Sequence, residues 1–288
     1  MEKNLTTGSV LKNILFFSLP YLFSYFLQTL YGMADLFIIG QFEGVAATTA
    51  VSIGSQVMHM LTVMIVGLAM GTTVSIAQAI GANKKDDAAA ATGNTVTLFL
   101  ILSVCLTGAL LCVIRPITMI MSVPEEAVSG TIAYLTICFI GIPFITAYNI
   151  ISSIFRGMGD SKSPMYFIAV ACVANIILDY IFIGLCHFGP AGAALGTTVS
   201  QAISVIVSLF VIVKRKTGIS LKPSDFRPKR NVCGTILKIG IPIACQDGLI
   251  QISDADHRVT LPKTAEGASN SKQLKENVQF IATRMQQN

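Results

Sequence analysis

Two aspartates lie inside long apolar runs of this 288-residue chain, Asp35 in residues 14–40 and Asp179 in residues 165–185. A carboxylate at the centre of a membrane helix costs about 2.5–3.5 kcal/mol on insertion scales, so it usually faces a bundle interior or an aqueous cavity. A carboxyl group in such a place can bind a proton, or a hard cation such as sodium through its oxygens. We therefore expect Asp35 to line the polar wall of a cavity in a membrane transporter. The alternative is a core helix whose polar groups satisfy one another.

Asp35 shares one helix face with two other polar side chains. Gln28, Tyr31 and Asp35 are three and four residues apart, so a helix places them on the same side. Pro20 lies earlier in the same run and removes one backbone hydrogen bond, which predicts a kink. We expect this first run to be a bent membrane helix with a polar stripe.

Two later runs carry matching polar pairs. Asn175 lies one helical turn before Asp179, and Thr197 and Gln201 are four residues apart in the run 191–213. If these helices and the first one surround a single cavity, the two carboxylates repel each other in a partly dry space. Binding of a proton or of sodium would relieve that repulsion. The alternative for Asn175 and Thr197 is hydrogen bonding between helices, typically worth about 0.6 kcal/mol.

Composition argues against a soluble enzyme. Of the 288 residues, 53% are hydrophobic and 12% are charged, whereas soluble proteins contain about 25% charged residues. The net charge of +5 does not indicate nucleic-acid binding, because the basic residues stand in short loops between apolar runs. The seven cysteines are scattered, and no catalytic or metal-binding spacing is seen. We therefore expect no enzymatic activity, no cofactor and no metal, apart from the sodium alternative at Asp35 and Asp179.

The apolar runs predict an all-α polytopic membrane protein with a six-helix transmembrane bundle. A helix needs about 20 apolar residues to span a bilayer, and six runs suffice: 14–40, 48–70, 93–114, 131–154, 165–185 and 191–213. Pro143 predicts a kink inside the fourth run, and the third is almost wholly apolar. In and after the second run, small residues recur every fourth position and favour close packing against another helix: Gly67, Gly71, Ser75 and Ala79.

The chain divides into four parts by composition. They are a transmembrane domain at residues 1–213, a basic linker at 214–235, the start of a seventh helix at 236–252 and a polar tail at 253–288. Within the tail, apolar residues at helical spacing predict a short amphipathic helix over residues 272–285.

Positive charge indicates the orientation of the spans. Lys and Arg gather before the first span and after the second, fourth and sixth, whereas the opposite side carries only Arg115. Because positive residues mark the cytoplasmic side, we expect a multi-pass protein of the cell membrane with a cytoplasmic N-terminus. The sequence indicates no oligomeric state.

Several short motifs occur together along the chain. They are Pro20 with Ala34-Asp35, residues 78–82 (QAIGA), residues 156–160 (RGMGD) with Pro164, Asn175 with Asp179, and Gly196-Thr197. In this combination the chain resembles the multidrug and toxic compound extrusion (MATE) transporters over residues 8–252. The aspartate pair with its neighbouring asparagine is similar to the branch typified by DNA-damage-inducible-protein-F-like transporters.

The resemblance implies twelve helices in two six-helix lobes, with alternating access between the lobes. It implies proton- or sodium-coupled export of cationic or amphipathic small molecules across the bilayer. Asp35 and Asp179 would be the coupling carboxylates, and Pro20 would permit the first helix to bend on protonation. By the same match, Tyr31, Asn175 and Thr197 would belong to the hydrogen-bond network of the carboxylates.

The chain departs from the family pattern in its second half. Residues 14–23 (ILFFSLPYLF) compare with residues 236–245 (ILKIGIPIAC), as if a second copy of the six-helix unit began there. We therefore expect the N-terminal lobe only, followed by the start of the second, as in a truncated copy. One alternative function is a lipid-linked saccharide flippase, against which the lack of mid-span Arg or Lys argues. Another is a truncated membrane protein that transports nothing, which the polar tail supports.

Overall fold

The computed structural model describes residues 9–215 and 222–260, and every regular element in these ranges is helical. In chain order they are α1 (Val10–Phe42), α2 (Val45–Gly81), α3 (Lys85–Cys112), α4 (Ile114–Ile120), α5 (Glu125–Ile140), α6 (Ile142–Gly157), α7 (Lys162–Asp179), the π-helix η1 (Tyr180–Leu185), α8 (Gly189–Arg215), the 3-10 turn η2 (Pro223–Phe226) and α9 (Arg230–Thr260). The chain divides into two compact units, Met1–Cys245 and Gln246–Asn288. The described part of the second unit is the end of α9, and the predicted amphipathic helix at 272–285 lies outside the described residues.

Six of the described helices are long and apolar enough to cross a membrane. The pair α5–α6 gives a seventh if it is counted as one bent span. These helices coincide with the six predicted runs and with the predicted start of a seventh, so the all-α polytopic architecture is confirmed. Each of these helices begins before the corresponding apolar run. α3 begins at Lys85, where Asp86 and Asp87 in its first turn favour a helix N-terminus, and α9 begins at Arg230.

The fourth predicted run is a bent pair of helices. The axes of α5 and α6 differ by 48° at the break around Gly141. Pro143 lies in the first turn of α6, where its missing N–H costs no hydrogen bond. The predicted kink is therefore present, two residues before the proline. Gly141 also allows close packing, because a Cβ at this position would lie 2.7 Å from two atoms of Thr198 in α8.

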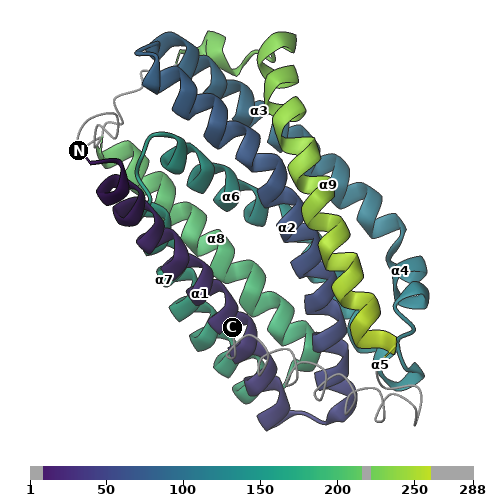
Figure 1. The fold of residues 1–288 in the computed structure, drawn as a ribbon. Coiled ribbons are helices and arrows are strands. Elements are labelled where there is room, and N and C mark those ends of the chain that lie inside the picture. The colour runs from purple at the N-terminus through teal and green to yellow at the C-terminus, as the bar shows by residue number, and fades with distance from the viewer. Residues whose placement is uncertain (1–8, 216–221, 261–288) are drawn as a thin grey trace, which may run out of the picture. The chain divides into compact units, whose positions relative to one another are not determined.

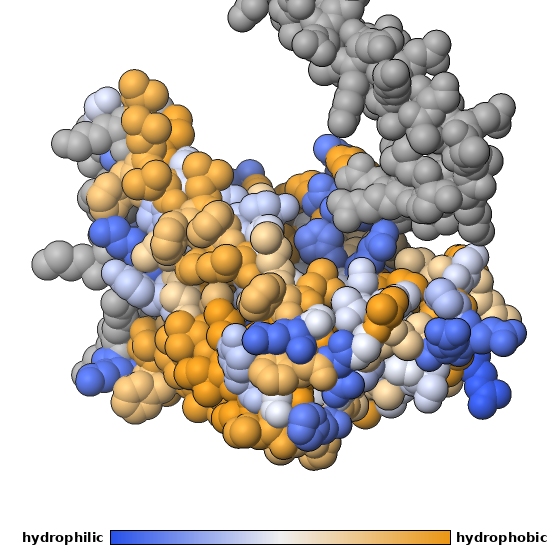
Figure 2. All heavy atoms as spheres, turned by 90° about the horizontal axis from the view of Figure 1, so that it is seen from below, coloured by the Kyte–Doolittle hydropathy of each residue, from blue (hydrophilic) through white to orange (hydrophobic). Residues whose placement is uncertain are grey.

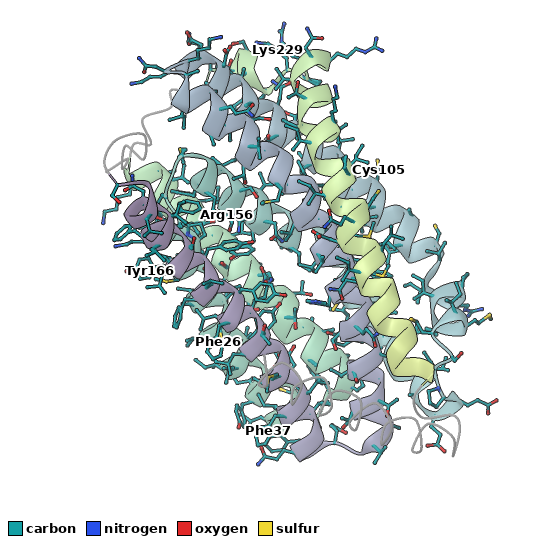
Figure 3. The ribbon with its side chains drawn as sticks, viewed as in Figure 1. Phe26, Phe37, Cys105, Arg156, Tyr166 and Lys229 are labelled. Atoms are coloured by element: carbon teal, nitrogen blue, oxygen red, sulfur yellow. The ribbon has the colours of Figure 1, made fainter. Side chains whose placement is uncertain are left out.

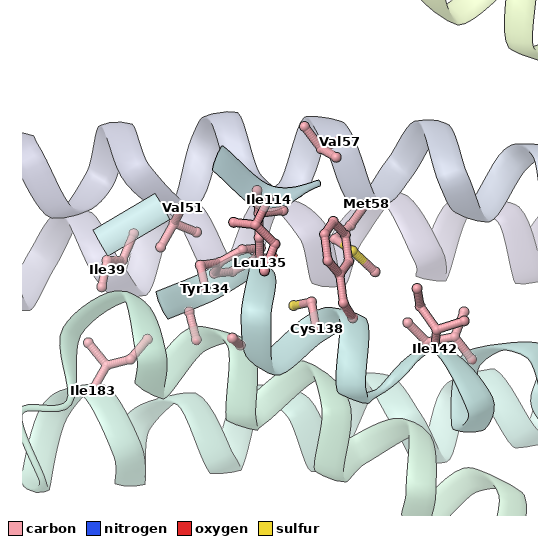
Figure 4. Close-up of a cluster of buried hydrophobic side chains, with 14 of the residues drawn as sticks. Ile39, Val51, Val57, Met58, Ile114, Tyr134, Leu135, Cys138, Ile142 and Ile183 are labelled. Atoms are coloured by element: carbon pink, nitrogen blue, oxygen red, sulfur yellow. The ribbon is translucent and has the colours of Figure 1, made fainter. Parts of the chain in front are cut away.

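The helices pack around hydrophobic clusters that leave room for polar groups. α7 packs against α8 and α1, while α2 packs against α5 and α6 (Figure 1). Figure 4 shows the largest cluster, in which Tyr134, Leu135 and Cys138 of α5 meet residues of α2 and η1 such as Val51 and Ile183. The core thus holds α1, α7 and α8 together on one side and joins them through α5 to α2.

The predicted close approach of small residues occurs between α2 and α9. A Cβ on Gly67 would lie 2.8 Å from the Cα of Ala244, and one on Gly71 would overlap the carbonyl oxygen of Ile236. On the facing helix, Gly240 meets the backbone of Leu68 in the same way. Small residues on both helices therefore let the two backbones touch, as at other membrane-helix interfaces. The prediction is confirmed for Gly67 and Gly71.

A buried polar contact joins α3 to the segment before α9, although the third run was expected to be almost wholly apolar. Asn94 is fully buried, and its amide nitrogen donates to the carbonyl oxygens of Ala90 at 2.8 Å and Asp225 at 3.0 Å. Its amide oxygen accepts the backbone N–H of Lys229, and the Thr97 hydroxyl donates to the carbonyl oxygen of Phe226 at 2.7 Å. Part of the predicted basic linker is therefore fixed on α3, a contact that a single polar residue in an apolar run does not reveal.

The outer surface is rich in large apolar side chains, as expected for a protein in lipid. Phe26 and Phe37 of α1 are 59% and 68% exposed (labelled in Figure 3). Figure 2 shows hydrophobic side chains over much of the visible face, with hydrophilic ones gathered in separate patches. Side chains exposed in this way lose nothing in a bilayer, where the lipid tails are as apolar as they are.

Candidate functional site

The structure brings the two intramembrane aspartates together. Asp35 of α1 is 3% exposed and Asp179 at the end of α7 is 0% exposed. Their carboxyl groups interact with each other, although the two residues are 144 positions apart in the sequence. Two carboxylates side by side in a buried place repel each other strongly unless a proton or a cation lies between them. The grouping that the helical spacing suggested is therefore present in the fold.

Asp179 is placed by an irregular helix and by a glycine. It is the last residue of α7, and the chain continues without interruption as the π-helix η1, a rare form that is frequent at functional sites. On the facing helix α8, a Cβ on Gly196 would overlap the Asp179 Oδ1 atom. Only a glycine therefore lets the carboxyl group of Asp179 rest against the α8 backbone.

Two neutral side chains border the pair. The Thr197 hydroxyl of α8 donates to Asp35 Oδ2 at 3.2 Å. Asn175 lies one turn before Asp179 on α7, is 1% exposed and interacts with Asp35. Four of the predicted site residues, from three helices, thus form one cluster: Asp35, Asp179, Asn175 and Thr197.

The cluster contains buried oxygens without donors. Among the described residues, Asp35 Oδ1, both carboxyl oxygens of Asp179 and both amide atoms of Asn175 have no hydrogen-bond partner. No Lys or Arg of the described chain forms an ion pair with either aspartate. Buried polar atoms in folded proteins are nearly always satisfied. Oxygens in this arrangement are suited to a proton or a small cation.

The other predicted site residues lie near this cluster or extend from it. Tyr31 is half-buried one turn before Asp35 and packs beside Tyr148 of α6. Gln201 lies one turn after Thr197 on α8 and is 4% exposed, and its Oε1 has no hydrogen-bond partner in the described ranges. Gln28 is half-buried on α1.

Pro20 lies inside α1, which is assigned as one continuous helix. The hydroxyl of Ser24 donates to the carbonyl oxygen of Pro20 at 2.8 Å, within the same helix. Its role as a hinge stays a prediction.

No larger metal-binding cluster accompanies the two aspartates. Within residues 9–215 and 222–260, no group of three or more His, Cys, Asp or Glu side chains is arranged to hold a metal ion. The donors at the pair are carboxyl, hydroxyl and amide oxygens, which are hard ligands. Such a donor set suits a proton or sodium rather than a transition metal.

Sequence reasoning missed the polar face of α6. Tyr148, Asn149, Ser152 and Ser153 are all buried, and Arg156 follows at the end of the same helix. A signal existed, because Tyr148, Ser152 and Arg156 are four residues apart and so share one helix face. The role of Gly196 was also missed, since a glycine motif does not show which side chain needs the space.

Comparisons with known proteins agree with this architecture. The MatE family model matches residues 20–181. The "Probable multidrug resistance protein YpnP" of Bacillus subtilis is 34% identical over 243 residues, covering 84% of this chain and 54% of that protein. The "Probable multidrug resistance protein NorM" of Thermotoga maritima is 29% identical, covering 82% of this chain and 51% of that protein. The chain spans about half the length of the curated relatives it matches.

Solved structures of MATE proteins share the fold. A "multidrug resistance MATE family transporter" in an outward-facing conformation matches with a TM-score of 0.78 and 31% identity over 83% of this chain and 53% of that chain. A MATE protein described "in the bent conformation" gives a TM-score of 0.78 at 32% identity, covering 82% of this chain and 53% of that chain. A MATE protein "in the straight conformation" gives a TM-score of 0.76 at 31% identity, covering 83% of this chain and 53% of that chain.

Proposed function

This chain belongs to the MatE family, and from that premise we propose that it carries the cation-coupling site of a multidrug antiporter. The antiporter would export cationic or amphipathic small molecules by alternating access, in exchange for a proton or sodium. Asp35 and Asp179 would bind the coupling ion, and Asn175, Thr197 and Tyr31 would orient it. Gln28 and Gln201 would extend the polar wall toward the substrate. No cofactor takes part in this proposal.

The observation that carries the proposal is the buried carboxyl pair, which has no cationic partner among the described residues. A structural role for two buried carboxylates normally involves an Arg or Lys partner, because an unpaired buried charge is costly. Here both carboxyl groups meet each other and a hydroxyl instead. A site built in this way is incomplete until a proton or a cation enters, which is what an ion-coupled transporter requires.

Exchange of the ion for a cationic substrate follows from charge. With the ion bound, the pair is neutralised and a cationic substrate gains little from approaching it. With the ion released, the negative pair attracts the substrate and raises its affinity. Because Asp35 lies on α1 and Asp179 on α7, ion binding also changes the attraction between these helices. Pro20 would let the part of α1 before it respond separately.

The protein would lie in the cell membrane with its N-terminus in the cytoplasm. In support, Lys84 and Lys85 stand at the turn between α2 and α3, and Arg156 and Lys162 stand at the turn between α6 and α7. By the alternation of the spans, both turns are on the side of the N-terminus. Positive residues are enriched on the cytoplasmic side of membrane proteins.

Efflux from proteoliposomes tests the proposal. We expect Asp35→Asn and Asp179→Asn each to abolish ethidium efflux driven by a proton or sodium gradient, since an amide cannot take up the ion. The matched control is Asp87→Asn, the same chemical change at an exposed position in the first turn of α3.

A second measurement reports on the ion itself. In weakly buffered detergent solution, addition of ethidium to the native chain should release protons if the coupling ion is a proton. In sodium medium it should displace bound ²²Na if the coupling ion is sodium. The signal that the native chain gives should disappear in Asp35→Asn and Asp179→Asn and persist in Asp87→Asn. Coupled efflux or ion release that survives both Asp35→Asn and Asp179→Asn would refute the proposed role.

A further inference from the structure

Two positive side chains near the turn between α6 and α7 lie over aromatic rings of α1. The guanidinium carbon of Arg156 is 5.3 Å from the centre of the Tyr21 ring. The Nζ of Lys162 is 4.6 Å from the centre of the Phe16 ring. Both distances are within the range of cation–π attraction, which extends to about 6 Å. The two rings flank Pro20 on α1.

Arg156 has little else to hold it. Its Nη2 donates to the Ser153 hydroxyl of its own helix at 3.1 Å, while its Nε has no hydrogen-bond partner in the described chain. Arg156 also forms no ion pair with a described carboxylate. The Tyr21 ring is therefore a contact that takes the guanidinium of Arg156 from its own helix to another one. An ion pair with a carboxylate would compete with the ring for the guanidinium, and Arg156 has no such pair among the described residues.

Lys162 is held in position by a tight turn. The Asp160 Oδ1 atom accepts the backbone N–H groups of Lys162 and Ser163, both at 3.0 Å. The Ser163 hydroxyl also donates to Asp160 Oδ2. Asp160 thus caps the start of α7, and the stem of Lys162 begins from a fixed backbone. Residues 156–163 therefore form one hydrogen-bonded turn, the platform, from which both cations extend.

The contact between Arg156 and Tyr21 joins two helices whose backbones stay apart and that meet only through side chains. Within the described residues, no Cα atom of α1 lies within 8 Å of α6, so only long side chains can bridge them. Figure 3 shows Arg156 on α6, on the side that faces α1. Close backbone packing holds α1 to α7 but not to α6, so the part of α1 around Pro20 faces α6 through side chains such as Tyr21 alone.

The contact and the carboxyl pair lie on the same face of α1. Tyr21, Gln28 and Asp35 are seven residues apart, which is nearly two full turns of a helix each time. Fourteen residues at 1.5 Å rise place Tyr21 about 21 Å along the axis from Asp35. One face of α1 thus carries the ion site at one end and the aromatic contact at the other, with Pro20 next to the contact.

We propose that Arg156 and Lys162 form a latch that holds the part of α1 before and around Pro20 against the platform between α6 and α7, and that this latch must open when α1 bends. The latch makes Arg156 and Tyr21 positioning residues for the transport cycle. The proposal rests on the proposed function only in assigning the bending of α1 to that cycle. A cation–π pair shifts an equilibrium by roughly two- to fivefold at an exposed site, so it biases the position of α1 without locking it.

Spin-label distances test the latch directly. Labels are placed at Leu11→Cys on α1 and Ala77→Cys on α2, both exposed positions, in a full-length chain whose native cysteines are replaced. Pulsed electron resonance in lipid nanodiscs then gives the distribution of distances between the two labels. We expect Tyr21→Leu and Arg156→Gln each to raise the minor, displaced population of α1 roughly two- to fivefold. Tyr21→Phe is the matched control, because it removes the hydroxyl and keeps the ring, and it should leave the distribution unchanged.

A double-mutant comparison separates the latch from general loosening. If the two side chains act through each other, Tyr21→Leu with Arg156→Gln should displace α1 no further than either change alone. The latch is overturned if Tyr21→Leu leaves the distribution as in the native chain, if Tyr21→Phe behaves like Tyr21→Leu, or if the two effects add. Because the distances are measured without substrate or ion gradient, they do not depend on coupling. If Tyr21→Leu displaces α1 while efflux by Asp35→Asn is unimpaired, the latch is supported and the proposed function is refuted. If Tyr21→Leu leaves α1 in place while Asp35→Asn abolishes efflux, the latch is refuted and the proposed function is supported.

Discussion

Replacing Gly196 by alanine should separate the Asp179 carboxyl group from Asp35. The new Cβ would overlap Asp179 Oδ1 and lie 3.1 Å from its Cγ and 3.6 Å from the Asn175 amide nitrogen. The carboxyl group cannot stay where it is, and the site is enclosed by α1 and α8, so either the side chain leaves its rotamer or α8 shifts. Overpacking of this kind costs about 1–3 kcal/mol, which corresponds to roughly 5- to 150-fold in the equilibrium between the native site and a displaced one.

Gly108→Ala is the matched control for this change. Gly108 also lies inside a long helix, α3, and a Cβ there meets no atom within 4 Å. Gly→Ala in a helix interior is by itself stabilising by about 0.4–1 kcal/mol. Thermal unfolding in detergent should therefore give a lower Tm for Gly196→Ala and an equal or higher Tm for Gly108→Ala. Ion release on addition of ethidium should fall only in Gly196→Ala.

A second substitution checks that the clash is with Asp179. In an Asp179→Ala background the oxygen that Gly196 accommodates is gone, so Gly196→Ala should cost little or nothing there. The difference between the two backgrounds should be about 1–3 kcal/mol, the whole of the overpacking cost. If Gly196→Ala lowers stability equally in both backgrounds, or behaves like Gly108→Ala, the close contact between α8 and the carboxyl group is not what fixes the site.

Two further predictions concern single hydrogen bonds. Thr197→Val removes the donor to Asp35 while keeping the shape of the side chain. It should change the ion affinity by roughly two- to tenfold, since such a bond contributes about 0.5–1.5 kcal/mol. A titration of ion release checks this, and Thr136→Val is the control because the Thr136 hydroxyl donates to Ile132 within its own helix. Asn94→Leu leaves the buried carbonyl oxygen of Asp225 and the part-buried N–H of Lys229 without a partner. It should lower the free energy of unfolding by about 1–3 kcal/mol, mainly through the buried oxygen. A Tm equal to that of the native chain would contradict the second prediction.

Long apolar runs and helical spacing were enough to predict the spans and the members of the site. Asp35, Asn175, Asp179 and Thr197 could be identified because a polar side chain in a membrane helix must face other protein, which leaves few arrangements for the helices that carry them. The same reasoning gave the small-residue interface at Gly67 and Gly71, although the partner helix, α9, could not be read from α2 alone.

The features that sequence reasoning missed depend on contacts between distant segments. Gly196 matters because of an oxygen on another helix, and Asn94 because of a loop more than a hundred residues later. Neither partner is encoded by local periodicity. The π-helix after Asp179 cannot be recognised from its residue types, because it differs from an α-helix only in bonding each residue one position further along the chain. The polar face of α6 was visible in the spacing of Tyr148, Ser152 and Arg156 and needed only to be counted.

The contact between Asn94 and the segment before α9 also imposes an order of events during synthesis. When α3 first enters the bilayer, the carboxamide of Asn94 can bond only to Ala90, four residues before it. Its remaining partners are Asp225, Lys229 and Cys233, which leave the ribosome more than 130 residues later. Until then the amide of Asn94 lacks these partners inside the protein, so contact with water or with the insertion machinery is favourable for α3. The contact of α3 with the segment before α9 is therefore completed late in synthesis.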